Sequence, residues 1–224
     1  MGSPDTEPGY GAHEGPVHTV TFSQGYFLAK YELTTAIHEA CETSGACEVP
    51  SGPWGDSAGW GLNRSDTGRA EHAQNELRWR DAVAACAWLA PGGRPPSEAE
   101  WEYAATGPVH RVYPWGDEPA PSCAAALAAY DEDDDAARPW GCDPCTDYGC
   151  SGSMPVGSFP NGVAWSGALD LAGNVSEWML DNQNPIGLGN YEGAPTNGVA
   201  WQIPTSTQRS LRGGGFHHGP NSLL

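Results

Sequence analysis

Glycine and proline are so frequent in this chain that long helices or strands are not expected. Thirty glycines and twenty prolines stand among its 224 residues, although this share stays below the roughly 25–30% of low-complexity disordered chains. Ten tryptophans, eight tyrosines and four phenylalanines supply large side chains for a core. We therefore predict a single ordered domain over residues 1–224, of the α+β class, with few short helices and much irregular loop.

The charge balance excludes several classes of partner. Twenty-eight acidic residues against ten basic ones give a net charge of −18. Nucleic acids and anionic membrane surfaces attract basic patches, so we expect neither as a partner. No apolar run approaches the roughly 20 residues of a membrane-spanning helix, and we expect a monomer without a direct membrane span. An acidic surface suits solubility and the binding of divalent cations.

The clearest local signal is a helix start at Ser97. This serine is a favourable N-cap residue, and Glu100, three positions later, can reach back to its backbone N–H. Glutamates in the first turn suit the positive end of the helix dipole, and Gly107 is a natural stop. The segment therefore predicts a helix over Ser97–Ala105.

The other elements follow from hydrophobic periodicity and from turn residues. Alternating apolar residues predict strands, whereas apolar residues three or four apart predict helices. The expected elements are strands over Val17–Phe22 and Tyr26–Leu33, helices from Thr34 or Thr35 to about Ser44 and over Arg80–Ala90, a long acidic loop over Pro119–Gly152, and short central strands within Leu169–Leu180 and Arg209–Phe216.

Five sequence blocks follow one another in order along most of the chain. They are Arg94–Gly107 (RPPSEAEWEYAATG), Tyr113–Gly116 (YPWG), Pro155–Asn161 (PVGSFPN), Gly167–Trp178 (GALDLAGNVSEW) and Arg212–Phe216 (RGGGF). Together they resemble the formylglycine-generating-enzyme family, also called sulfatase-modifying-factor domains. The resemblance implies a C-type-lectin-like α+β fold with a small twisted sheet. Met1 matches a position inside a strand of the family pattern, and the chain ends soon after the last block, so we interpret the domain as truncated at both ends.

The resemblance implies a copper-dependent oxidase that converts a sulfatase cysteine to formylglycine. In the family, two cysteines separated by four residues bind Cu(I) beyond the last block, because soft thiolates suit that ion. Here His217–Leu224 contains no cysteine, so copper is not expected in this chain. We interpret the chain as a binding or scaffold module for an unknown protein or glycan. The alternative is an oxidase whose catalytic cysteines are supplied beyond Leu224.

A third interpretation is an iron-dependent sulfoxide-forming oxidase of the ergothioneine-synthesis type. That activity would need a histidine-rich helical iron site from another domain. The sequence shows no such site.

Calcium is the cofactor that the resemblance favours. The family commonly holds Ca²⁺ in the loop that corresponds to Ala172–Trp178, and the matching ligands are Asn174, Glu177 and the carbonyl of Val175. Ca²⁺ takes six to eight oxygen ligands and accepts backbone donors in irregular loops. The alternative is structural: Glu177 would pair with an arginine such as Arg212, and Asn174 would cap a turn.

The seven cysteines indicate an oxidising compartment. We expect an exported, bacterial-type protein located outside the cell or in the periplasm or cell envelope, with a signal sequence upstream of Met1. Cys41 and Cys47 flank a turn that could close a short disulfide. Cys86 lies on an apolar helix face and is interpreted as a small buried hydrophobe.

The four remaining cysteines lie in the acidic loop. Cys142, Cys145 and Cys150 are interpreted as disulfide partners or a clip of that loop. Two alternatives stay open: Cys145 and Cys150 have the four-residue gap of a copper pair, and Cys123 could complete a zinc site.

Overall fold

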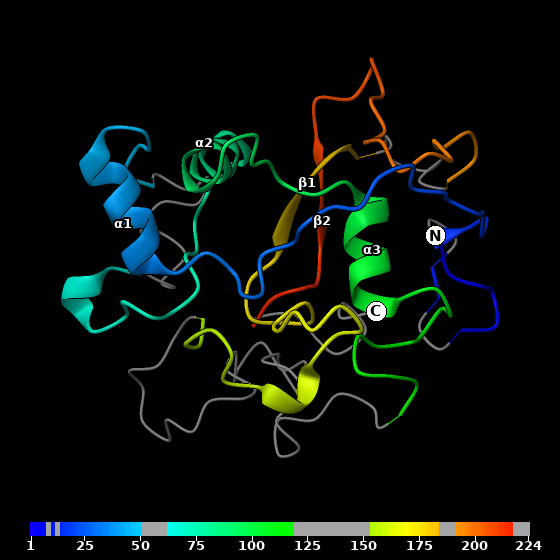
Figure 1. Ribbon diagram of the computed structural model, residues 1–224, viewed down its shortest axis with the longest axis horizontal. Coiled ribbons are helices and arrows are strands. Elements are labelled where there is room, and N and C mark those ends of the chain that lie inside the picture. The colour runs from blue at the N-terminus through cyan, green and yellow to red at the C-terminus, as the bar shows by residue number, and fades with distance from the viewer. Residues whose placement is uncertain (8–9, 12–13, 51–61, 119–152, 184–190, 217–224) are drawn as a thin grey trace.

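The structure is a computed structural model that describes residues 1–7, 10–11, 14–50, 62–118, 153–183 and 191–216. Short helices, a small sheet and long connecting segments make up this part of the chain, so the predicted α+β class is confirmed (Figure 1). The predicted loop over 119–152 lies outside the described residues. The elements are α1 (Thr35–Ser44), the 3₁₀ turn η3 (Ser65–Thr67), α2 (Trp79–Leu89), α3 (Glu98–Thr106), the 3₁₀ turn η4 (Pro160–Gly162), β1 (Glu177–Asn182) and β2 (Arg209–Arg212).

Helix α1 begins and ends at the residues that the sequence predicted. The Thr34 hydroxyl accepts the backbone N–H of Ile37 at 3.3 Å, which satisfies one of the unpaired donors at a helix start. Gly45 follows the last turn at φ 78°, a left-handed conformation that glycine adopts without steric cost.

Helix α3 begins with the predicted capping box. Ser97 Oγ accepts from the backbone N–H of Glu100 at 3.2 Å, and a carboxylate oxygen of Glu100 accepts from the backbone N–H of Ser97 at 2.8 Å. Arg94 also pairs with Glu100 at 2.7 Å. Gly107 ends the helix, as predicted.

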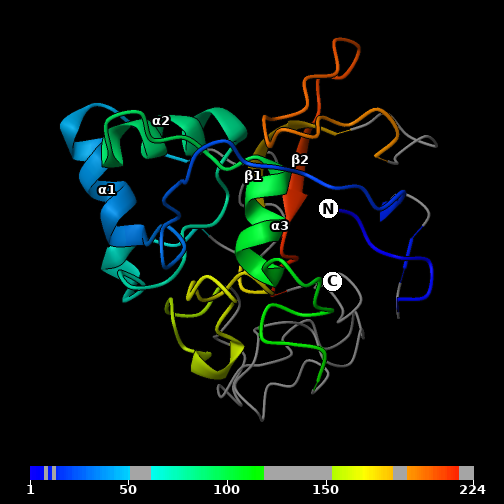
Figure 2. The same ribbon diagram turned by 45° about the vertical axis from the view of Figure 1, so that its right-hand side comes forward.

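Hydrogen bonds from two tryptophans connect the region of helix α2 to the sheet. The indole N–H of Trp79 donates to the carbonyl of Met179 in β1 at 2.9 Å. In the opposite direction, the indole N–H of Trp178 in β1 donates to the carbonyl of Leu77, just before α2, at 2.8 Å. Both views place α1 beside α2, and α3 beside the sheet (Figures 1 and 2).

Strands β1 and β2 pair antiparallel and form a two-stranded sheet. Glu177 lies opposite Arg212, and Trp178 opposite Leu211, before the register shifts further along β1. The two predicted central strands are therefore confirmed. The strands predicted over Val17–Phe22 and Tyr26–Leu33 are wrong, because neither segment forms a ladder with any described residue.

The main core lies where α3 meets β1. Its buried members are a tryptophan, a methionine and several small residues, and Leu28 packs against them from the N-terminal segment. A second cluster joins α1 to α2 through Cys41, Cys47 and Ala85. Within the described residues, no helix is long and apolar enough to cross a membrane. The members of the main core are Trp101, Ala105, Ala164, Ala168, Leu171 and Met179.

Candidate functional site

Three carboxyl groups lie close enough for their charges to interact: one precedes α1, and two belong to the segment that leads into β1. The first is Glu32, which precedes α1. One of its oxygens accepts from the backbone N–H of Val175 at 3.0 Å, and the other accepts from the side-chain amide of Asn174. Burial, and then the charges of Asp170 and Glu177, raise the pKa of Glu32 well above its usual range.

The second carboxyl group belongs to Asp170, which is only 5% exposed. Its backbone lies at φ 64°, in the left-handed region that aspartate tolerates better than most residues. One oxygen accepts from the backbone N–H of Gly157 at 2.6 Å. Burial raises the pKa of Asp170, and the hydrogen bond from Gly157 opposes that rise.

The third carboxyl group, Glu177, is the first residue of β1. Its Oε1 atom is buried and makes no hydrogen bond with any described residue, although the residue as a whole is partly exposed. Burial raises the pKa of Glu177 to about 7. The indole N–H of Trp101 lies near enough to favour the ionised form, but it too completes no hydrogen bond of good geometry within the described part of the chain.

No described arginine or lysine neutralises this carboxyl cluster. Arg212 lies opposite Glu177 in the sheet, yet its guanidinium pairs with Glu98 at 3.0 Å and with Glu102 at 3.7 Å. The structure therefore does not show the ion pair between Glu177 and Arg212 that was the structural alternative. Buried carboxylates without a counterion are costly, so a cation would stabilise this region.

The chemistry of these donors fits Ca²⁺, which prefers carboxylate and carbonyl oxygens. Within the described ranges, no three acidic, histidine or cysteine side chains already converge to hold one metal ion. If Ca²⁺ binds here, the carboxylates of Asp170 and Glu177 and backbone carbonyls such as that of Val175 would hold it.

Asn174 occupies the centre of the loop in a supporting position. It lies at φ 59°, its side-chain oxygen accepts from the backbone N–H of Met154 at 2.8 Å, and its amide donates to Glu32. Its backbone carbonyl accepts from Phe216 at 2.8 Å. In this arrangement Asn174 orients a carboxylate and joins two of the sequence blocks.

The sequence analysis missed Glu32 and Asp170 as members of this site. A signal existed for Asp170, which is an acidic residue between apolar neighbours, whereas Glu32 follows the charged Lys30 and did not stand out. Periodicity alone could not show that these stretches meet in space.

The structure confirms one predicted disulfide and shows one free cysteine among the described residues. Cys41 and Cys47 form the predicted disulfide, with an S–S distance of 2.03 Å. Cys86 is a free thiol, half-buried on α2, and burial raises its pKa, which disfavours the reactive thiolate. The predictions for the cysteines of the acidic loop and for residues 217–224 concern residues outside the described ranges; these cysteines are Cys123, Cys142, Cys145 and Cys150.

These features define the class of protein: it is a loop-rich α+β domain with a buried acidic cluster beside a two-stranded sheet. The chain matches the family described as the sulfatase-modifying factor enzyme 1-like domain over residues 1–223. It belongs to this family, and the resemblance in the sequence is confirmed.

Relatives within the family carry different names. The chain is 36% identical over 149 residues to a formylglycine-generating enzyme from Thermomonospora curvata, covering 59% of this chain and 43% of the relative. It is 34% identical over 140 residues to the mouse protein named inactive C-alpha-formylglycine-generating enzyme 2, covering 62% and 41%. The matched part thus spans about two fifths of the length of these relatives.

Solved structures agree on the fold. PvdO from Pseudomonas aeruginosa superposes with a TM-score of 0.71 at 25% identity, covering 99% of this chain and 80% of PvdO. The family-type α+β fold is therefore confirmed.

Proposed function

We propose that this chain is a calcium-stabilised binding or scaffold module of the sulfatase-modifying-factor family. The observation that supports calcium is the buried oxygen of Glu177, which accepts no hydrogen bond of good geometry from a described residue and lies near the carboxyl groups of Glu32 and Asp170. A divalent cation there would balance charge that no described cation balances.

The chain's own residues prepare this site for an ion. The N–H of Val175 and the amide of Asn174 fix the carboxylate of Glu32, while the N–H of Gly157 fixes Asp170. Bound Ca²⁺ would supply electrostatic neutralisation and a bridge between segments, and no reaction step is assigned to it. The ion would thereby hold the loop before β1 against the segment before α1.

Thermal unfolding of the whole chain tests the calcium proposal. Saturating Ca²⁺ should raise the melting temperature over that in EDTA by roughly 5–10 °C, the size expected at about 100 times Kd for a chain of this length. Asp170→Asn and Glu177→Gln should each abolish that rise. Asp66→Asn, a change at an exposed carboxylate, should keep it. Equal melting temperatures in EDTA and in Ca²⁺ would exclude the site.

We further propose that the protein is exported. The disulfide between Cys41 and Cys47 supports this, because such bonds persist mainly in oxidising compartments. Alkylation of intact cells followed by mass mapping tests it: a bridged pair supports export, whereas two alkylated thiols contradict it.

The second candidate is the copper-dependent oxidase, which the names of several relatives favour. Among the described cysteines, two are bonded to each other and Cys86 is single, so they offer no free pair to Cu(I). The test is aerobic incubation of the folded chain and Cu(I) with a sulfatase-type peptide containing Cys-x-Pro-x-Arg. We expect no conversion to the aldehyde by mass spectrometry. Conversion would establish the oxidase and direct mutagenesis to Cys145 and Cys150.

A further inference from the structure

The pentapeptide Asn-Gly-Val-Ala-Trp occurs twice in this chain, over residues 161–165 and 197–201, and the sequence contains no other Asn-Gly step. The two copies share a pattern of burial: the asparagine and the valine are exposed in both, and the glycine is buried. Because the five residues are identical, a difference in reactivity between the copies comes chiefly from the fold around each of them.

An Asn-Gly step can rearrange without an enzyme, because glycine has no Cβ to hinder its peptide nitrogen. That nitrogen attacks the side-chain carbonyl carbon of the asparagine. A bond forms between the two atoms, the bond from the carbon to the amide nitrogen breaks, and the amide leaves as ammonia with the peptide proton. Water then opens the cyclic imide at either carbonyl, which gives aspartate or isoaspartate. Water is the only co-reactant, and nothing is oxidised or reduced.

The first copy is held in a geometry that opposes this attack. Asn161 and Gly162 belong to the 3₁₀ turn η4, and the N–H of Gly162 donates to the carbonyl of Phe159 at 3.0 Å. The attacking nitrogen must lose this proton, so the hydrogen bond of the turn has to break first. Further along, the N–H of Trp165 donates to the carbonyl of Ala105, near the end of α3, at 3.2 Å. The fold therefore protects Asn161.

The second copy places the same groups for attack. The N–H of Val199 donates to the side-chain oxygen of Asn197 at 3.3 Å. This hydrogen bond closes a turn that contains both the side-chain carbonyl carbon of Asn197 and the peptide nitrogen of Gly198. It also directs an N–H group at the oxygen on which negative charge develops during the attack. The fold therefore favours reaction at Asn197.

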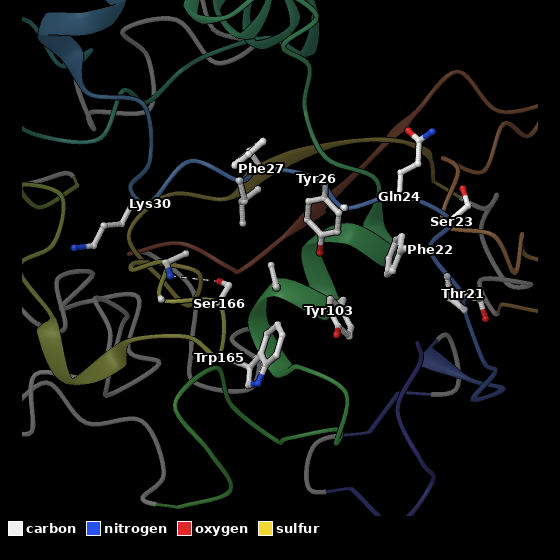
Figure 3. A pocket seen from close by; sticks show the side chains of 16 residues that line it. Thr21, Phe22, Ser23, Gln24, Tyr26, Phe27, Lys30, Tyr103, Trp165 and Ser166 are labelled. Carbon is white, nitrogen blue, oxygen red and sulfur yellow. Dashed lines mark hydrogen bonds between the residues drawn. The ribbon is translucent and has the colours of Figure 1, made fainter.

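The peptide at Gly198 is packed against the start of α3. Its carbonyl accepts from the hydroxyl of Ser97, the N-cap residue of α3, at 2.8 Å. A Cβ on Gly198 would overlap the ring of Phe22, and Figure 3 shows Phe22 beside the helix, next to Tyr26 and Tyr103. An isoaspartate carries the main chain through one additional carbon, so it shifts Gly198 relative to Ser97 and Phe22.

We propose that Asn197 is a site of spontaneous deamidation to isoaspartate, whereas Asn161 is protected by its turn. The modification adds a negative charge and lengthens the main chain between Thr196 and Gly198. It thereby loosens the segment 191–201 from the start of α3. The reaction becomes faster as pH rises, because the attacking nitrogen must lose its proton. This inference does not rest on the binding function or on the calcium site proposed above.

Peptide mapping of the whole chain by mass spectrometry, after incubation at mildly alkaline pH, tests the site. The mass gain of an amide-to-acid conversion should appear at least about tenfold faster at Asn197 than at Asn161. Hydroxylamine, which cleaves the cyclic imide, should cut the chain after Asn197. Asn197→Gln should abolish that cut, because glutamine would have to form a larger ring. Asn161→Gln is the matched control and should leave the cut unchanged.

The same incubation in guanidinium chloride separates the effect of the fold from that of the sequence. Without the fold, the two copies should react at similar rates. Equal rates in the native chain, or a faster reaction at Asn161, would overturn the proposal. A preference for Asn197 that persists at the same size in the denaturant would also overturn it, since the fold would then have no part in it.

Thermal unfolding tests the consequence for α3. Conversion of Asn197 to isoaspartate should lower the melting temperature by roughly 2–4 °C in a chain of this length. Asn197→Asp adds the charge without the additional main-chain carbon and should lower it less. An isoaspartate form that melts at the temperature of the unmodified chain would overturn the link to α3.

Discussion

The protonation of Glu177 links a single residue to the stability of the fold. Its folded pKa of about 7 lies above the ordinary value of 4.5, so the folded chain binds the proton more tightly than the unfolded chain. Without divalent cations, the stability that this proton provides is complete below about pH 4.5 and is lost as pH rises through 7. Between these two limits, the contribution of Glu177 to the free energy of unfolding changes by roughly 3 kcal/mol.

Chemical denaturation in EDTA at pH 5 and pH 7.5 measures this effect. We expect the free energy of unfolding of Glu177→Gln to fall less between pH 5 and pH 7.5 than that of the unmodified chain. Part of the fall should remain, because burial also raises the pKa of Asp181, to about 6. Glu118→Gln, at an exposed residue, should keep the full pH dependence. An identical pH dependence in Glu177→Gln and the unmodified chain would contradict the assignment.

Asn174 combines a positive φ with two side-chain contacts, and substitutions can separate these effects. Asn174→Gly loses the hydrogen bonds to Met154 and Glu32 but accepts the φ of 59°, so we expect a loss of about 1–3 kcal/mol. Asn174→Ala should lose about 1 kcal/mol more, because alanine resists the left-handed conformation. Urea denaturation measures both, and equal stability of the two variants would show that backbone strain contributes nothing.

At the scale of the element, α3 depends on Ser97, the N-cap residue just before it. Ser97 caps the helix, and its hydroxyl also donates to the carbonyl of Gly198 at 2.8 Å. We expect Ser97→Ala to lower the free energy of unfolding by about 1–2 kcal/mol. Thr43→Ala, at an exposed position late in α1, should change it by less than about 0.5 kcal/mol. Similar losses in the two variants would argue against a specific capping role.

The disulfide fixes the end of α1. Cys41 is fully buried, and the bridge to Cys47 spans a sequence separation of six. Closing so short a loop stabilises the fold by about 2 kcal/mol in the chain-entropy account. We expect the double variant Cys41→Ala with Cys47→Ala to lose about that amount in denaturant unfolding. The same double variant should be insensitive to reductant, whereas the unmodified chain should not be.

Helices and strands differed in how far the sequence could predict them. The caps Thr34 and Ser97 act on neighbouring residues, so the beginnings of α1 and α3 could be predicted from local spacing. A strand also needs a partner. The alternation in Val17–Phe22 agrees with the partial burial of Val20 and Phe22, but Val17 is exposed. The pattern also contained no information on whether another strand lies alongside, and none does among the described residues.

At the scale of the whole molecule, the acidic site is assembled from distant segments. Glu32 lies more than a hundred residues before Val175, to which it is hydrogen-bonded. The loop pattern predicted Glu177, because that residue belongs to a recognisable block, but not Glu32 or Asp170 as partners. Only the folding of Tyr26–Leu33 against the loop shows that these carboxyl groups share one region.

Calcium and protons should compete for this region, since both reduce the negative charge of a chain that carries −18. Glu177, with a pKa of about 7, and Glu32, with a raised pKa, retain protons that Ca²⁺ would displace. We therefore expect Ca²⁺ affinity to rise between pH 6 and pH 8, with net release of protons. Calorimetric titration in two buffers of different ionisation enthalpy measures that release, and Glu177→Gln should reduce it. Binding without proton release, at constant affinity across this pH range, would place the ion at exposed carboxylates instead of in the buried cluster.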